Sequence, residues 1–193
     1  WKGLVGSEMC IRDSYVIMAT KKGQVKKTSL EQYSRPRSNG INAITIKDGD
    51  VLLEAKLTTG QSQVVLAVKS GKAIRFEENK TRPMGRNASG VRGIRLANDA
   101  DEVIGMVSVN DMDSDILVVS ENGYGKRSKL EDYRMTNRGG KGVKTISITE
   151  KTGSLVSIKN VSDSYDLMII NRSGIAIRMV VESLRVMGRA TQG

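Results

Sequence analysis

The sequence repeats itself with a period of about fifty residues. One glycine recurs 48 to 52 residues apart, and a second glycine follows each copy by 17 or 19 residues. A period of this length is typical of arrays in which each unit buries its apolar face only against its neighbours. The chain is therefore expected to form one repeat domain. The first glycines are Gly23, Gly71, Gly123 and Gly174, and the second glycines are Gly40, Gly90, Gly142 and Gly193.

Within each unit the apolar pattern indicates β-strands. In the third unit, an apolar run at 115–120, the turn Asn122-Gly123 and a run at 124–128 predict a hairpin, because Asn and Gly both tolerate the positive φ of tight turns. Alternating residues after each second glycine predict another strand, and a further apolar run closes the unit. The alternating pairs are Ile44/Ile46, Ile94/Leu96 and Ile146/Ile148, and the closing runs are 51–57, 103–109 and 155–161.

These strands predict an all-β fold, a propeller-like array of repeated four-stranded blades. Only segments 29–33 and 129–133 are expected to form helical turns. The predicted units lie near 15–57, 64–109, 115–161 and 166–193, with the last one incomplete.

The first fourteen residues stand outside this pattern. Residues 9–14 look like the translation of a transposase recognition end used in sequencing-library preparation. We therefore expect residues 1–14 to be a non-native leader, with a genuine flexible segment as the alternative. The only Cys, Cys10, and the only Trp, Trp1, fall within it, so residues 15–193 offer no thiol chemistry.

The positive charge of the chain recurs with the same period. The formal net charge is +10, and a basic residue stands four positions after each first glycine. More basic residues gather before each second glycine, where Arg presents paired donors to phosphate and glycines admit backbone N–H groups. Solvation of the turns is the alternative for any single unit. The predicted phosphate contacts are Arg37, Arg86, Arg92, Lys126, Arg127, Arg138, Gly139, Gly140, Lys141, Gly142, Lys144 and Arg189, with Lys27, Arg75 and Arg178 as a secondary basic rim.

The sequence also excludes several kinds of chemistry. It contains no His, which removes His-based nucleophile pairs and His-ligated zinc, and no glycine-rich loop is placed to hold a nucleotide. We therefore predict no catalytic residue, metal or cofactor in this chain. No apolar run reaches the ~18 residues of a membrane span, so a cytoplasmic protein without a membrane partner is expected. The acidic residues Asp99, Asp101, Asp111, Asp113 and Asp115 lack the spacing of oxygen ligands and are interpreted as solvated loop carboxylates.

Four short segments resemble a known family. They are 122–127, 84–86 with 90–96, 187–193, and the run Arg-Gly-Gly-Lys-Gly at 138–142. Together they resemble the C-terminal domain of the bacterial DNA gyrase A subunit over residues 15–193, although each alone would be unspecific. The run at 138–142 matches the last five residues of the family's box, Gln-Arg-Arg-Gly-Gly-Lys-Gly.

The resemblance implies a β-pinwheel, usually of six blades, whose basic outer rim wraps double-stranded DNA. In that family the wrap sets the handedness of strand passage by a type II topoisomerase, which introduces negative supercoils. The implied partners are the other domains of the A subunit, together with the B subunit, in two copies of each. ATP, Mg²⁺ and the catalytic Tyr belong to other parts of that enzyme, so this chain is expected not to be an enzyme by itself.

Two features depart from the family pattern. Thr136 and Asn137 replace the first two box residues, and the box lies in the third visible unit instead of the first. Residues 138–142 are therefore either the functional box or a repeat that drifted toward it. Four visible units, where six are usual, indicate a fragment.

Two alternatives from related or different classes remain. The topoisomerase IV A subunit carries a related but degenerate and less basic pinwheel. A protein-binding propeller should expose aromatic side chains, yet only 4% of the residues are aromatic and none recurs in all four units. The same scarcity argues against single-stranded nucleic acid, which stacks on aromatic platforms. Duplex DNA held through its phosphates is the expected ligand.

Overall fold

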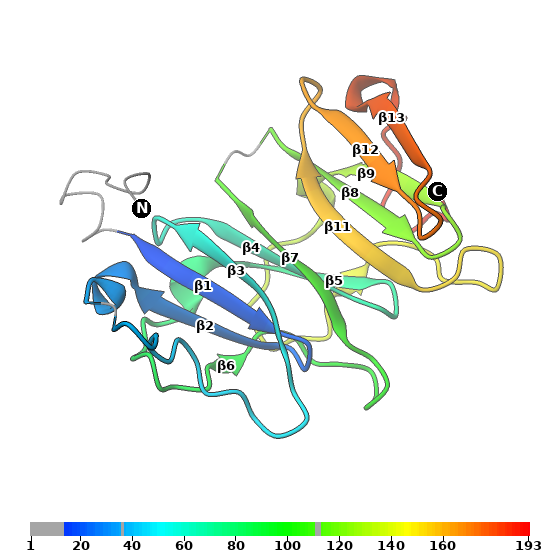
Figure 1. The fold of residues 1–193 in the computed structure, drawn as a ribbon. Coiled ribbons are helices and arrows are strands. Elements are labelled where there is room, and N and C mark those ends of the chain that lie inside the picture. The colour runs from blue at the N-terminus through cyan, green and yellow to red at the C-terminus, as the bar shows by residue number, and fades with distance from the viewer. Residues whose placement is uncertain (1–13, 36, 111–112) are drawn as a thin grey trace.

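The chain folds into four antiparallel sheets that stand side by side in the order of the sequence (Figure 1). The structure, a computed structural model, describes residues 14–35, 37–110 and 113–193. The predicted all-β fold is confirmed, with helix only as single 3₁₀ turns among these residues. The predicted leader lies outside the described residues except for Ser14.

Each unit contributes a hairpin and a 3₁₀ turn, and each of the first three units ends in a further strand, called its inner strand, which is β3, β7 or β11. A short strand also follows the second glycine of the second and third units. The elements of the first two units are β1 (Tyr15–Thr20), β2 (Gln24–Ser29), η1 (Leu30–Tyr33), β3 (Leu52–Thr58), β4 (Gln63–Val68), β5 (Lys72–Glu77), η2 (Glu78–Lys80), β6 (Val91–Arg92) and β7 (Val103–Val109). Those of the last two are β8 (Asp115–Ser120), β9 (Gly125–Lys129), η3 (Leu130–Asp132), β10 (Val143–Lys144), β11 (Leu155–Val161), β12 (Asp166–Ile170), β13 (Ala176–Val180) and η4 (Val181–Ser183).

The first glycines close the hairpins. Gly123 has a φ of +83° and donates its N–H to the Ser120 carbonyl at 3.0 Å. No described residue other than glycine has a positive φ, so the expectation that Asn122 shares this conformation was wrong. The turn instead has the three-residue form in which only its last residue is left-handed. The predicted helical turns are present as η1 and η3, and η2 and η4 were not predicted.

Neighbouring units exchange strands. In the first sheet the order is β3-β1-β2-β6, so its fourth strand comes from the second unit, and Val25 pairs with Val91. In the second sheet β10 of the third unit pairs with β5, which places Val143 opposite Ala73. The predicted four-stranded blades are therefore present in these two sheets, and each is completed by a strand of the next unit. The exchange joins neighbouring blades through backbone hydrogen bonds.

The alternating pairs predicted as a strand are not on strands. The paired segments end at Arg92 and Lys144, before Ile94 and Ile146 are reached, and residues 41–46 pair with no strand. Ile94 and Ile146 are nonetheless buried, because the irregular chain after each short strand turns them into the core between sheets. The apolar pattern at these positions therefore reflects the burial of the side chains and not a strand conformation.

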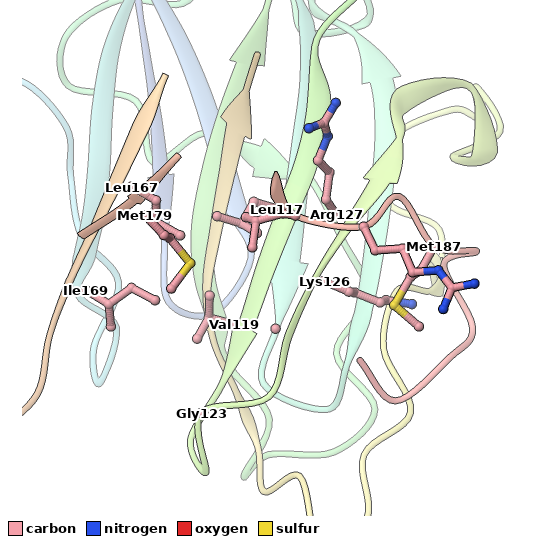
Figure 2. A pocket seen from close by; sticks show the side chains of 12 residues that line it. Leu117, Val119, Gly123, Lys126, Arg127, Leu167, Ile169, Met179 and Met187 are labelled. Atoms are coloured by element: carbon pink, nitrogen blue, oxygen red, sulfur yellow. The ribbon is translucent and has the colours of Figure 1, made fainter. Parts of the chain in front are cut away.

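The core lies between successive sheets. Strand β4 is buried on both faces: Val64, Leu66 and Val68 pack toward the first sheet, and Val65 and Ala67 pack toward the third. The core between the third and fourth sheets is smaller, and a cavity of about 240 Å³ remains there. Figure 2 shows its aliphatic and sulfur-containing lining, which includes Leu117, Val119, Leu167, Ile169 and Met179.

Candidate nucleic-acid interface

Four loops, one in each unit, follow the 3₁₀ turns and pass the second glycines. We call them rim loops 1 to 4; their described residues are 34–35 with 37–46, 82–96, 134–148 and 185–193. Each of the last three begins by hydrogen-bonding to the preceding unit. The N–H groups of Met84, Thr136 and Met187 donate to the carbonyls of Lys27, Arg75 and Arg127, at 2.8, 2.9 and 2.7 Å. The outer hairpin strand of one unit therefore positions the rim loop of the next.

The second glycines allow this close approach. At Gly90, Gly142 and Gly193, φ is +90°, +72° and +107°. A Cβ at these positions would lie 2.5, 2.6 and 2.9 Å from the carbonyl oxygens of Val25, Ala73 and Gly125. Any other residue would be strained by its backbone conformation and would collide with the neighbouring strand. Packing between units thus explains the second glycine in the last three units, whereas a Cβ at Gly40 would meet no atom within 4 Å.

Successive rim loops are also joined to one another. In the first three rim loops, the residue five positions after the second glycine donates its N–H to a backbone carbonyl of the next rim loop. The acceptor residue stands two positions before the second glycine of that loop. These bonds run from Thr45 to the Ala88 carbonyl at 3.3 Å, from Arg95 to that of Gly140 at 2.8 Å, and from Ser147 to that of Thr191 at 3.0 Å. The rim loops therefore form one connected surface.

The arginines four positions before three of the second glycines brace this surface. Arg138 donates Nε to the Lys80 carbonyl at 2.9 Å and Nη1 to the Arg92 carbonyl at 3.2 Å. Arg189 repeats both bonds in the next loop, with the carbonyls of Asp132 and Lys144 at 2.9 Å each. Arg86 donates Nη1 to Asn42 in the same way at 3.2 Å. These guanidinium groups hold neighbouring loops together and remain only partly buried.

The other predicted contacts on the rim loops are accessible. Arg37, Arg92, Lys141 and Lys144 are exposed. In rim loop 3, Gly139 has a φ of +81° and donates its N–H to the Gly93 carbonyl at 2.6 Å. Gly139, Gly140 and Gly142 therefore shape the loop that presents Lys141.

The basic residues after the first glycines are not on an exposed rim. Lys27, Arg75 and Arg127 are only 4, 6 and 5% exposed. Each donates to the carbonyl of the first residue of the next unit's 3₁₀ turn: Lys27 to Glu78 at 3.3 Å, Arg75 to Leu130 at 2.8 Å, and Arg127 to Val181 at 3.0 Å. Their assignment as phosphate contacts was wrong, because these cations link one unit to the next inside the array.

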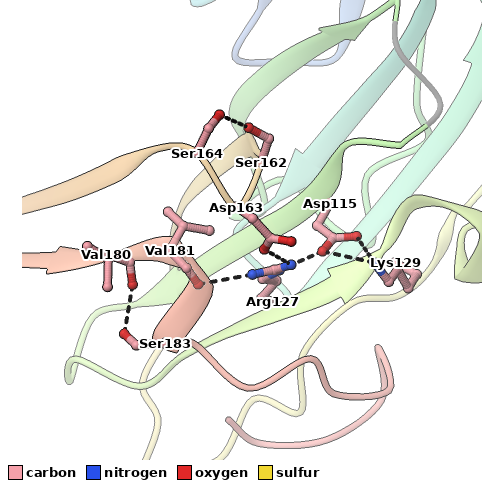
Figure 3. A network of polar contacts seen from close by, with 9 residues as sticks. All are labelled: Asp115, Arg127, Lys129, Ser162, Asp163, Ser164, Val180, Val181 and Ser183. Carbon is pink, nitrogen blue, oxygen red and sulfur yellow. Dashed lines mark hydrogen bonds and ion pairs between the residues drawn. The ribbon is translucent and has the colours of Figure 1, made fainter.

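Arg127 is held by a network of ionic contacts (Figure 3). Its Nε lies 2.5 Å from Oδ2 of Asp115, and its Nη2 lies 2.5 Å from Oδ1 of Asp163. Burial lowers the pKa of Arg127, but the hydrogen bonds that it donates to Asp115 and Asp163, together with their negative charges, outweigh this effect and raise the pKa. Lys129 approaches the Asp115 carboxylate to 3.1 Å on its exposed side. Arg127 therefore stays charged within the core.

The last two predicted basic residues also differ from expectation. Lys126 is 3% exposed and donates Nζ to the Gly188 carbonyl at 2.7 Å, so it cannot contact phosphate directly. Arg178 is exposed, as expected, but its guanidinium pairs with Asp166 across the β12–β13 hairpin. Neither residue lies on a rim loop.

Two of the acidic residues are structural and not solvated. Asp115 is 2% exposed and belongs to the Arg127 network, and Asp101 is 7% exposed. Asp101 accepts hydrogen bonds from the N–H and hydroxyl of Ser70 at 3.0 and 2.8 Å, which anchors the β4–β5 turn. The interpretation of solvated carboxylates fits Asp99 and Asp113, which are exposed, and Asp111 lies outside the described residues.

Three exposed arginines were missed by the sequence reasoning. Arg82, Arg134 and Arg185 each stand eight positions before a second glycine, and all three are exposed. Each directly precedes the residue that forms a parallel bridge with the preceding unit: Pro83 with Lys27, Met135 with Arg75, and Val186 with Arg127. The backbone that carries these arginines is therefore fixed at equivalent places. Their register with the glycines was the available signal.

Other kinds of site find no support in the described ranges. No group of three or more His, Cys, Asp or Glu side chains in residues 14–35, 37–110 and 113–193 could hold a metal ion. In the same residues no helix is long and apolar enough to span a membrane.

The chain matches a known protein family along most of its length. The family described as "DNA gyrase C-terminal domain, beta-propeller" matches residues 14–59, 63–110, 114–162 and 165–193. The A subunit of DNA gyrase from Staphylococcus aureus strain MRSA252 is 44% identical over 183 residues, which is 94% of this chain. The same protein from strain NCTC 8325 gives the same identity and coverage. The chain spans 20% of the length of these curated relatives.

Solved structures show the same architecture. A DNA gyrase A C-terminal domain matches with a TM-score of 0.84 and 26% identity, covering 97% of this chain and 62% of that one. The C-terminal domain of a DNA topoisomerase IV matches with a TM-score of 0.90 at 23% identity, covering 98% of this chain and 59% of that one. The second likeness establishes the fold alone, whereas sequence similarity favours gyrase over topoisomerase IV. From its repeats, sheets and sequence, the chain belongs to the family of DNA gyrase C-terminal β-propeller domains.

Proposed function

We propose that the chain binds duplex DNA through the phosphates along its rim loops and bends the duplex around the array. The observation that carries this proposal is the set of exposed arginines Arg82, Arg134 and Arg185, which recur at one position on three hydrogen-bonded loops. Charges fixed at regular places on a rigid surface suit a regular polyanion. The same surface is extended by the exposed side chains of Arg37, Arg92, Lys141 and Lys144. The partly exposed guanidinium groups of Arg86, Arg138 and Arg189 add to its positive charge.

A rigid rim is what bending requires. Bending a duplex through a large angle costs several kcal/mol by elastic estimates, and contacts along the curved path must offset this cost. The hydrogen bonds between rim loops hold the loops in place, so that they do not shift when the bent duplex tends to straighten. Tyr165 is the only aromatic side chain among the largely exposed apolar residues described, which supports a phosphate ligand over a protein partner or stacked bases.

We place this activity within a DNA gyrase, as the wrapping domain of its A subunit. The relatives are whole A subunits, so strand passage, negative supercoiling and assembly of two A with two B subunits are proposed for the complete protein. This chain contributes the DNA path that sets handedness, while ATP, Mg²⁺ and the catalytic Tyr act elsewhere. The cytoplasm, where bacterial DNA lies, is the proposed location.

The salt dependence of DNA binding tests the rim-loop interface. The slope of log affinity against log salt should be steep, and replacing Arg82, Arg134 and Arg185 together by Ala should reduce it by up to about 2.7, since each phosphate contact contributes ~0.9. Fluorescence anisotropy with a short duplex of mixed sequence measures the slope. Two unrelated duplexes should give the same result, because phosphate contacts carry no sequence information.

A variant with the same loss of charge serves as the control. Lys69, Lys159 and Arg172 are exposed, but they lie on hairpin turns and on the inner strand β11, and none belongs to a rim loop. Their joint replacement by Ala should change the slope much less than the rim variant does. Equal slopes for the two triple variants would rule out the rim loops as the interface.

A further inference from the structure

Two of the rim loops rest on buried ammonium groups. Lys26 and Lys126 stand three positions after Gly23 and Gly123, and they are 0 and 3% exposed. The equivalent position carries an apolar residue in the other two units, Ile74 and Ile177. Ile74 is buried like the two lysines, whereas Ile177 is exposed, so a buried apolar side chain also occupies this position in the second unit.

Both ammonium groups bind the backbone of rim loops. Lys26 donates Nζ to the Ala43 carbonyl at 2.6 Å and also to the Arg86 carbonyl, which joins rim loops 1 and 2. Lys126 donates Nζ to the Gly188 carbonyl at 2.7 Å and to the Thr191 hydroxyl at 3.2 Å, both in rim loop 4. The hydrogen bonds of a charged ammonium group are stronger than those of a neutral amine, so the charge of each lysine and the geometry of the loop are coupled.

Each site brings together two cations, a buried lysine on a hairpin strand and an arginine in the rim loop above it. Burial first, and then the charge of Arg86, lowers the pKa of Lys26 to about 8. Burial first, and then Arg189, lowers the pKa of Lys126 to about 8, while Asp132 acts in the opposite direction. The other polar group at the Lys26 site is the Tyr33 hydroxyl, which donates to the Ala43 carbonyl. In the described residues neither ammonium makes an ion pair with a carboxylate.

We propose that rim loops 2 and 4 are proton-linked phosphate sites, in which Lys26 and Lys126 act as positioning residues and DNA binding is accompanied by proton uptake. The inference rests on the proposed function and adds a chemical property to it. A phosphate beside Arg86 or Arg189 supplies the missing negative charge, which favours the protonated lysine beneath the loop. In return, the protonated lysine holds the loop in the geometry that meets the phosphate.

The direction of the pH effect follows from this linkage. Well below pH 8 both lysines are already charged in the free protein, so binding takes up no proton. Near pH 8 about half of each population is neutral, and binding should take up a total approaching about one proton per chain. If binding raises each pKa by about one unit, affinity should fall about fivefold per lysine between pH 7 and pH 9.

Titration calorimetry measures the uptake directly. The chain is titrated with a short duplex at pH 8 and at pH 6.5, each in two buffers of different ionisation enthalpy at one salt concentration. Net uptake at pH 8 that vanishes at pH 6.5 is expected. Binding at pH 8 without proton uptake would overturn this inference and leave the proposed function intact, whereas no binding at either pH would overturn the proposed function itself.

Substitutions assign the effect to these lysines. The double variant Lys26→Ile, Lys126→Ile carries the residue of the other two units and should lose both the proton uptake and the loss of affinity above pH 7. The matched control Lys141→Ala should bind more weakly at every pH while keeping the pH dependence. Retained uptake in a folded double variant would contradict the assignment, and if that variant does not fold, the calorimetry of the unmodified chain decides.

Discussion

Replacing Arg127 by Met should lower the free energy of unfolding by about 3 kcal/mol or more, because it leaves a buried carboxylate without its main partner. Asp115 is 2% exposed and loses the Nε contact at 2.5 Å. The Val181 carbonyl loses its donor as well, and with it the link from β9 to η4. Lys129 remains beside Asp115, which keeps the loss toward the lower end of the range for broken buried pairs. Urea denaturation followed by circular dichroism measures the change.

The fourth unit supplies a matched control for this substitution. Arg178 stands at the equivalent position and pairs with Asp166, but both side chains are largely in solvent, at 72 and 40% exposure. Arg178→Met should therefore leave the denaturation midpoint nearly unchanged, since exposed ion pairs contribute little. A similar loss of stability in both variants would show that burial does not decide the value of this contact.

Replacing Gly142 by Ala should destabilise the fold by about 2–4 kcal/mol, through strain and overlap acting together. The φ of +72° is unfavourable for any residue with a Cβ, and that Cβ would lie 2.6 Å from the Ala73 carbonyl oxygen. Ala73 is held in β5 and pairs with Val143, so relief of the overlap must disturb the strand exchange between units. Thermal or urea denaturation of the variant gives the loss.

Gly123 separates the two causes. Its φ is +83°, but a Cβ added there would meet no atom within 4 Å. Gly123→Ala should therefore cost only the conformational strain, about 1 kcal/mol. If Gly142→Ala costs no more than this, the close approach to β5 is not what requires glycine. The comparison also shows that the charge of residues 138–142 is best tested at Lys141, with the glycines left in place.

The sequence was sufficient for the repeat architecture because the period and the apolar pattern can be read from neighbouring residues in the chain. Each unit repeats its glycines at fixed spacing, its apolar runs and its turn residues. The all-β array and the hairpins could therefore be predicted without knowledge of the tertiary contacts. The loops before Gly90, Gly142 and Gly193 were also recognised as basic. Arg82, Arg134 and Arg185 were equally visible, since they share the register of the glycines.

What the tertiary structure decided is the role of each basic residue. Arg127 and Arg134 are both arginines at repeated positions, and nothing local marks one as 5% exposed and the other as exposed. Two groups stabilise Arg127 in its buried position: the carboxylate of Asp115 across the hairpin and the carbonyl of Val181, which is 54 residues away in the sequence. Strand exchange between units, seen in the pairing of Val25 with Val91, is likewise non-local. The sequence by itself determined the period, the strand content and the excess of positive charge, whereas burial, which sets whether a cation binds backbone or faces solvent, arises only when neighbouring units pack.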